Sequence, residues 1–271
     1  MAVFQPFSFL NTQVTGFPPV GSYVTSNLAY YFDFGESTSY SGTGTDIYNL
    51  APGLTTLGDA EIWAGTMDQG SKTTSGTTFD STKFTLQMGG SGGSWSQTST
   101  DQTWFGDVTS PPNSTWDSQF TVEIGYYYQP HNWSGQSQNY LAWGQRKAGP
   151  GQWGNLNTAT IGSVADYSLS PTLTPSAGTA QIVTFVWDNT SLKRYLNGSL
   201  SATTSISATR KNAQGSPFAW GARYTTETGD DRLGLPTWSE YQYVRFYEGK
   251  ALSSSEVSQN YNANKGRLGL S

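Results

Sequence analysis

Residues 241–268 read YQYVRFYEGKALSSSEVSQNYNANKGRL, an aromatic segment that runs into a helix-start signal. Within residues 241–247, Val244 and Phe246 fall on one face, which is the period-two pattern of a half-buried strand. Ser253 and Glu256 have the spacing of a capping box, in which the serine hydroxyl accepts a hydrogen bond from the backbone N–H of the glutamate. We therefore expect a strand followed by one short helix.

The predicted helix covers residues 253–265 and packs onto the body of the domain through apolar side chains. Leu252 and Val257 occupy the two positions of a hydrophobic staple, and Tyr261 continues the same contact. Gly266 stands where a residue in the left-handed conformation commonly ends a helix.

The rest of the chain has the composition of short strands joined by turns. Of 271 residues, 31 are glycine and 14% are aromatic, and the C-terminal segment has the longest helical period. This mixture is typical of an all-β, two-sheet antiparallel jelly-roll sandwich. Asn197-Gly198 predicts a tight turn with positive φ at both positions. The predicted strands are 28–34, 62–64, 83–88, 119–128, 140–144, 158–164, 181–187, 192–196, 217–224 and 238–247.

No linker divides the sequence, so we expect one domain, residues 27–271, preceded by an N-terminal arm, residues 1–26. The arm is rich in proline and phenylalanine and lacks a strand period; an irregular lead-in to the first strand is the alternative. We expect the arm to bind a neighbouring subunit or the surface of a larger assembly through Phe4, Phe7, Phe9 and Phe17.

Charge and cysteine content narrow the possible functions. The chain has no cysteine, which excludes disulfides and thiolate metal sites. Its net charge of −5 and its pI of about 4.8 argue against general binding to nucleic acid. We also expect no membrane insertion, because no apolar stretch is long enough to span a bilayer, and the N-terminus lacks the basic start of a signal peptide.

Six motifs in order resemble the laminin-G-like, concanavalin A-like lectin/glucanase superfamily. They are Phe120-Thr-Val-Glu-Ile124, Phe185-Val-Trp-Asp188, Leu192-Lys-Arg-Tyr-Leu-Asn-Gly198, Trp220-Gly-Ala-Arg223, Val244-Arg-Phe-Tyr247 and Leu252-Ser-Ser-Ser-Glu-Val257. The resemblance covers roughly residues 27–269 and is greatest to the version found in tailed-phage virion proteins, which the ending 260–269 especially resembles. It implies a two-sheet jelly roll, while the function differs among members of the superfamily.

Three functions follow from the resemblance, and the residues favour the first. We expect a non-enzymatic virion structural protein on the phage particle, either a capsid decoration or a tail-associated adhesion module, with other virion proteins and copies of itself as partners. The alternative is a soluble glycan-binding lectin module, and the third is a glycan-cleaving enzyme. Host-surface glycans are the expected ligand wherever adhesion is the function.

The residues give little support to catalysis. Glucanases on this fold carry carboxylates at alternate positions of one strand, about 5–5.5 Å apart in retaining enzymes. Glu123 stands alone on its predicted strand, and the single histidine, His131, has no obvious partner for a Ser-His-Asp triad.

No cofactor is expected, and calcium is the one metal worth weighing. Asp46, Asp230 and Asp231 have the residue type that calcium binds in loops, but solvated turn residues are the favoured interpretation.

A glycan site, if present, is expected on the loops of residues 128–153. This segment is rich in Asn, Gln, Gly and Trp, and loops on a rigid sandwich are common places for binding residues. We expect His131, Trp133 and Trp153 to form the site, with core or subunit contacts as the alternative for these aromatic side chains.

Overall fold

The computed structural model describes thirteen stretches of the chain, and the statements below concern these stretches. They are residues 21–52, 58–64, 71–88, 103–107, 119–128, 143–145, 152–154, 156–161, 167–206, 218–221, 223–224, 233–234 and 240–271. The predicted arm phenylalanines, Phe4, Phe7, Phe9 and Phe17, lie outside them, so the arm contact stays a prediction.

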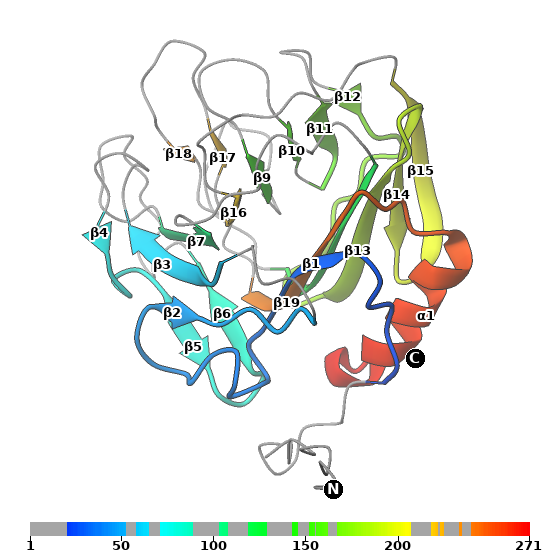
Figure 1. Ribbon diagram of the computed structural model, residues 1–271. Coiled ribbons are helices and arrows are strands. Elements are labelled where there is room, and N and C mark those ends of the chain that lie inside the picture. The colour runs from blue at the N-terminus through cyan, green and yellow to red at the C-terminus, as the bar shows by residue number, and fades with distance from the viewer. Residues whose placement is uncertain are drawn as a thin grey trace, which may run out of the picture.

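Two antiparallel sheets form the body of the described structure (Figure 1). We call the first sheet A. Its strands run in the order β15-β14-β13-β8-β19-β6-β5, and β1 also pairs with β19. The bounds are β1 Leu28–Asp33, β5 Thr78–Asp80, β6 Thr85–Gln87, β8 Phe120–Tyr127, β13 Ala180–Trp187, β14 Ser191–Leu196, β15 Ser199–Ser205 and β19 Glu240–Glu248.

The second sheet, sheet B, is made of shorter strands. Its order is β12-β11-β10-β9-β16-β7-β3-β2, and β4 also pairs with β3. The bounds are β2 Asp46–Ile47, β3 Ala60–Ala64, β4 Ser71–Lys72, β7 Thr103–Asp107, β9 Trp143–Gln145, β10 Gln152–Gly154, β11 Thr158–Ile161, β12 Tyr167–Ser168 and β16 Phe218–Trp220. A separate pair joins β17 Arg223–Tyr224 to β18 Leu233–Gly234.

The inner faces of the two sheets share one aromatic core. Trp220 of sheet B stacks on Phe105, with ring centroids 5.4 Å apart, and meets Phe32 of sheet A edge-on at the same distance. On β8 and at the residue that follows it, the alternate residues predicted to share a face all lie in this core: Phe120, Val122, Ile124, Tyr126 and Tyr128. The predicted all-β sandwich is therefore confirmed.

The C-terminal helix α1, Ser254–Asn264, covers the outer face of sheet A and continues into the 3-10 helix η1, Lys265–Leu268. The capping box of Ser253 and Glu256 is present, and the staple residues Leu252 and Val257 share one buried cluster on that face. The expectation for Gly266 is wrong. The backbone stays right-handed into η1, and Gly269, with φ 66°, takes the left-handed conformation.

One predicted turn is present in the structure, and one predicted strand is divided by a glycine. Asn197 and Gly198, with φ 48° and 77°, form the predicted tight turn between β14 and β15. The predicted strand 217–224 is instead divided at Gly221, whose φ is 86°, so that β16 and β17 join different sheets. Among the described residues, no helix is long and apolar enough to cross a membrane.

Candidate functional site

A row of directly paired positions crosses sheet B on its outer face. Directly opposite residues of neighbouring antiparallel strands share a face. The pairing connects Asp46 of β2 to Glu61 of β3, and from there runs through Gly106, Ala219 and Gly144 to Trp153 and Thr160. The alternate residues Ile47, Ala60 and Ile62 lie in the inner core, which assigns the row to the opposite face.

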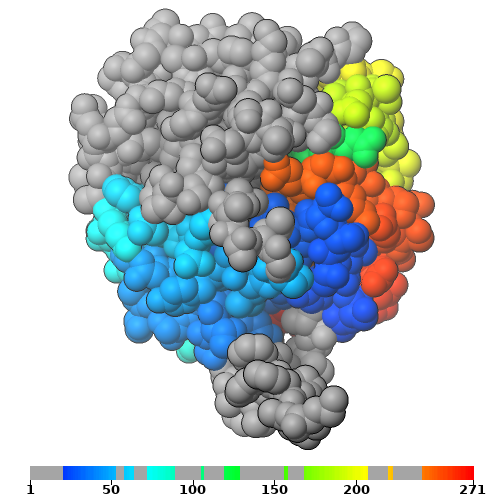
Figure 2. All heavy atoms as spheres, viewed as in Figure 1, coloured from blue at the N-terminus to red at the C-terminus, as the bar shows by residue number. Residues whose placement is uncertain are grey.

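Polar and aromatic residues gather at the β2–β4 end of this row, where Glu61 and Trp63 are half-buried. Asp46 lies directly opposite Glu61 in the β2–β3 ladder. Two residues further along β3, Trp63 lies directly opposite Lys72 of β4. Asp59 precedes β3 and is exposed, and Tyr48 follows β2 with 52% of its surface exposed. We call these residues the β2–β4 patch: Asp46, Tyr48, Asp59, Glu61, Trp63 and Lys72. Figure 2 shows the blue and cyan atoms of this region on the left surface, away from the red atoms of α1.

Lys72 lies between the two central carboxylates of the patch. Its ammonium group makes ion pairs with Asp46 and with Glu61, the latter at 2.9 Å. Hydrogen bonds to Asp46 and Glu61 raise the pKa of Lys72 above its ordinary value. The other oxygen of Glu61 accepts a hydrogen bond from the Trp63 indole N–H at 3.2 Å. Glu61 thus holds the Trp63 ring and the Lys72 ammonium group in place.

Two aromatic residues flank the carboxylates along the strand direction. Tyr48 lies two residues beyond Asp46 on one side, and Trp63 lies two residues beyond Glu61 on the other. Tyr48 itself lies just outside β2, where its backbone N–H donates to Ser39 O at 2.8 Å.

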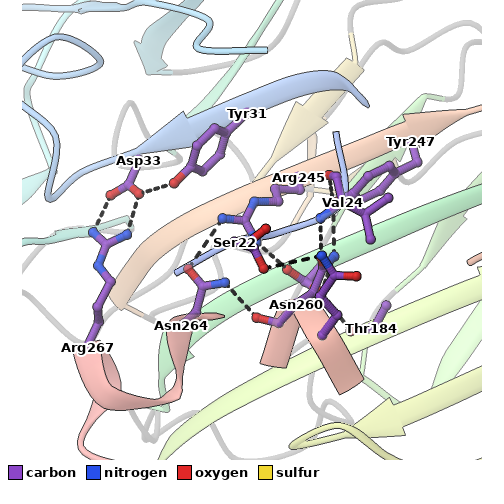
Figure 3. Close-up of polar contacts among 12 residues, drawn as sticks. Ser22, Val24, Tyr31, Asp33, Thr184, Arg245, Tyr247, Asn260, Asn264 and Arg267 are labelled. Atoms are coloured by element: carbon purple, nitrogen blue, oxygen red, sulfur yellow. Dashed lines mark hydrogen bonds and ion pairs between the residues drawn. The ribbon is translucent and has the colours of Figure 1, made fainter. Parts of the chain in front are cut away.

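The other large polar cluster lies between sheet A and α1 and is fully buried (Figure 3). Arg267 donates two hydrogen bonds to Asp33, at 2.5 and 2.6 Å, and the Tyr31 hydroxyl donates a third at 2.5 Å. Burial alone would raise the pKa of Asp33, but the Arg267 guanidinium and these hydrogen bonds outweigh it and lower that pKa.

Arg245 and Glu123 form the second buried ion pair of this cluster, at 2.9 Å. Asn260 of α1 donates to the other oxygen of Glu123 at 3.1 Å, and the Arg245 guanidinium lies 4.1 Å from the ring centre of Tyr23 and 4.4 Å from that of Tyr31. Both carboxylates are inaccessible to solvent, so this cluster fastens α1 and residues 21–24 to the sheet and offers no site for a ligand.

The described residues give a partial view of the predicted glycan site. His131 and Trp133 lie outside them. The backbone of Trp153 lies in β10, five strands from β2 in sheet B, and its part in a glycan site stays a prediction.

Calcium binding stays a prediction. Asp46 is exposed and paired with Lys72, and Asp230 and Asp231 lie outside the described residues. Within the described stretches, no group of three or more His, Cys, Asp or Glu side chains is placed to hold a metal ion.

Sequence reasoning did not single out Tyr48, Glu61, Trp63 or Lys72. A signal was available at residues 60–64, Ala-Glu-Ile-Trp-Ala, where Glu61 and Trp63 alternate with core residues. The partners on β2 and β4 lie in two-residue strands that carry no period of their own.

No protein-family model and no curated protein sequence matches the chain. Among solved structures, the chain resembles domain 4 of AbnA, a GH43 extracellular arabinanase from Geobacillus stearothermophilus, in complex with arabinotriose. The TM-score is 0.59 at 16% identity, over 88% of this chain and 100% of that one.

Two larger proteins contain a similar fold. The binding domain of botulinum neurotoxin DC, in complex with SialylT, matches with a TM-score of 0.52 at 10% identity, over 89% of this chain and 52% of that one. A Trypanosoma rangeli sialidase in complex with 2,3-difluorosialic acid matches with 0.53 at 13% identity, over 92% of this chain and 35% of that one.

Identities this low establish the fold and no more. The protein is an all-β, two-sheet sandwich domain whose fold is similar to that of these solved domains. The tailed-phage version of that resemblance stays a prediction.

Proposed function

We propose that the protein is a non-enzymatic carbohydrate-binding module and that it binds a glycan on the β2–β4 patch. The observation that carries the proposal is the contact of Glu61 with both Trp63 and Lys72 on the outer face of sheet B, with the exposed Tyr48 directly after β2. This is the glycan-binding alternative of the sequence analysis, at a different place on the domain.

The patch has the two kinds of group that sugar recognition needs. An exposed aromatic ring offers a flat apolar surface that can stack on the C–H face of a sugar ring. Charged acceptors such as Asp46 make short, strong hydrogen bonds with hydroxyl groups. The AbnA domain, solved with arabinotriose, and the toxin binding domain, solved with SialylT, support the proposal because both share the fold.

The arrangement of charges favours binding over hydrolysis. A retaining glycosidase places its two carboxyl groups about 5–5.5 Å apart on either side of the scissile bond. Asp46 and Glu61 are direct cross-strand neighbours, but the Lys72 ammonium group lies between them. The space that the sugar would need between an acid and a nucleophile is occupied.

A place in a virus particle remains a separate proposal that rests on the sequence resemblance. The fold comparison offers it no support. Glycan binding is consistent with a particle-borne adhesion module, and with a free lectin as well.

The experiment is a glycan microarray followed by calorimetric titration of the strongest ligand. We expect weak binding, with a Kd of about 1 mM per site, or about −4 kcal/mol. Tyr48→Ala and Trp63→Ala should each weaken binding about tenfold, since each removes a stacking surface.

Leu200→Ala is the matched control. Leu200 has 57% of its surface exposed, but it lies on β15 at the edge of sheet A. Its removal should leave the affinity unchanged. Equal losses in all three variants, or no bound glycan on the array, would contradict the proposed function.

A further inference from the structure

The β2–β4 patch has an excess of negative charge. It contains three carboxylates, Asp46, Asp59 and Glu61, and one cation, Lys72, in a chain whose net charge is −5. Lys72 is already paired with Asp46 and Glu61, so an incoming anion could recruit it only by breaking these contacts.

We propose that the patch selects neutral, hydroxyl-rich glycans and rejects glycans that bring a carboxylate or sulfate to it. This inference rests on the proposed function. A hydroxyl group donates to a carboxylate without placing two like charges together. An acidic sugar would place its own anion near Asp46 and Asp59, where the like charges repel each other.

Asp46 is the specificity-determining residue of this arrangement. Its side chain is 54% exposed, so it can accept hydrogen bonds from a ligand while it contacts Lys72. Glu61 has one oxygen bound to Lys72 and the other to Trp63, which makes it a positioning residue for the ring and the ammonium group. Asp59 contributes charge, and one of its oxygens accepts a hydrogen bond from the Asn49 backbone N–H.

The test compares neutral and acidic ligands that share a common core. On one array we would place lactose with 3′-sialyllactose, and methyl-esterified oligogalacturonides with their de-esterified forms. At low ionic strength we expect the neutral members to bind at least about tenfold more tightly, and this ratio to shrink as salt screens the exposed charges.

The double variant Asp46→Asn/Asp59→Asn identifies the source of the discrimination. Asparagine keeps a side-chain oxygen acceptor and removes the charge, so the ratio between neutral and acidic ligands should fall several-fold towards one. Asp188→Asn, which removes one carboxylate from the β13–β14 turn on sheet A, should leave the ratio unchanged.

The outcomes separate this inference from the function on which it rests. Equal or tighter binding of the acidic members would overturn the inference and leave glycan binding standing. A ratio that survives the double variant would likewise overturn it, because the discrimination would then come from shape. Failure of every glycan to bind would overturn the proposed function, and the inference with it.

Discussion

Gly125 shows how one residue permits the packing of sheet A. An added Cβ atom at this position would lie 2.2 Å from Cε1 of Tyr243, whose ring is fully buried against β8. The pairing between β8 and β19 shifts register at this point, between Tyr241 and Tyr243 of β19. The absence of a side chain at Gly125 and the position of the Tyr243 ring therefore depend on each other.

We predict that Gly125→Ala lowers the free energy of unfolding by about 1–3 kcal/mol, because the methyl group forces the Tyr243 ring or the strand to move. Urea denaturation measures the change. Gly266→Ala is the matched control, since an added Cβ there meets no atom within 4 Å, and it should change stability by less than about 0.5 kcal/mol. Equal effects at both positions would refute the packing argument.

Asp33 gives a pH-dependent prediction at the same scale. Its pKa is lowered in the folded state, so its contribution to stability is complete above the unfolded pKa of about 3.9 and is lost as the pH falls through the folded value. Asp33→Asn should cost about 3–5 kcal/mol at neutral pH, because it removes the negative charge that offsets the buried Arg267 guanidinium.

Denaturation curves between pH 2 and pH 7 check this prediction. The stability of the wild-type protein should fall more steeply below pH 4 than that of Asp33→Asn. The double variant Asp33→Asn/Arg267→Gln should recover part of the loss at neutral pH. If the stability of the wild-type protein and that of Asp33→Asn changed with pH in the same way, the Asp33–Arg267 pair would not be the source of the pH dependence.

At the scale of elements, local chemistry predicted the helix start but not what lies under the helix. The capping box and staple need only residues 252–257, and both are present. The face that α1 turns to the sheet includes Asn260, which donates to Glu123, and Asn264, which accepts from Arg245. These residues come from distant parts of the sequence, so no local period could indicate the cluster.

We predict that Ser253→Ala costs about 1 kcal/mol of stability through loss of the N-cap. In the structure, the Ser253 hydroxyl accepts from the Glu256 N–H at 3.3 Å, and Glu256 accepts from the Ser253 N–H at 2.8 Å. Thermal unfolding measures the effect. Ser254→Ala, at an exposed first-turn position, serves as the control and should be nearly neutral. A loss confined to Ser254→Ala would contradict the capping argument.

The long strands could likewise be predicted from local sequence, whereas the short strands could not. Alternating apolar residues predicted β8, β13 and β14, because long strands of a sandwich expose their period in the sequence. Strands of two or three residues, such as β2 and β4, are defined by their partners. The β2–β4 patch involves these short strands, which is why the sequence did not indicate its residues.

At the scale of the whole molecule, the outer faces of the two sheets differ. That of sheet A is covered by α1 and by residues 21–24, where the Val24 N–H donates to Asn260 at 2.9 Å and the Gly21 N–H donates to Ala263 at 2.9 Å. The last residues of the predicted arm thus lie against the folded domain. On sheet B, Asp46, Tyr48, Asp59 and Lys72 of the β2–β4 patch are exposed, whereas Ala219 further along the row is buried.

We predict that deletion of residues 2–20 leaves a stable folded domain, whereas deletion of residues 2–26 lowers stability by at least about 2 kcal/mol. The longer deletion removes the burial of Val24 and its hydrogen bonds to Asn260 and Tyr247. Denaturation measures stability, and gel filtration tests whether residues 2–20 are needed for self-association. If the shorter deletion unfolds the domain, those residues belong to its core.

The most direct test of glycan binding at sheet B is a crystal structure of the protein soaked with the strongest ligand from the array. We expect a sugar ring within about 4 Å of the Tyr48 or Trp63 ring, with a hydroxyl group hydrogen-bonded to Asp46. A glycan bound elsewhere on the domain, with Tyr48 and Trp63 untouched, would contradict the assignment.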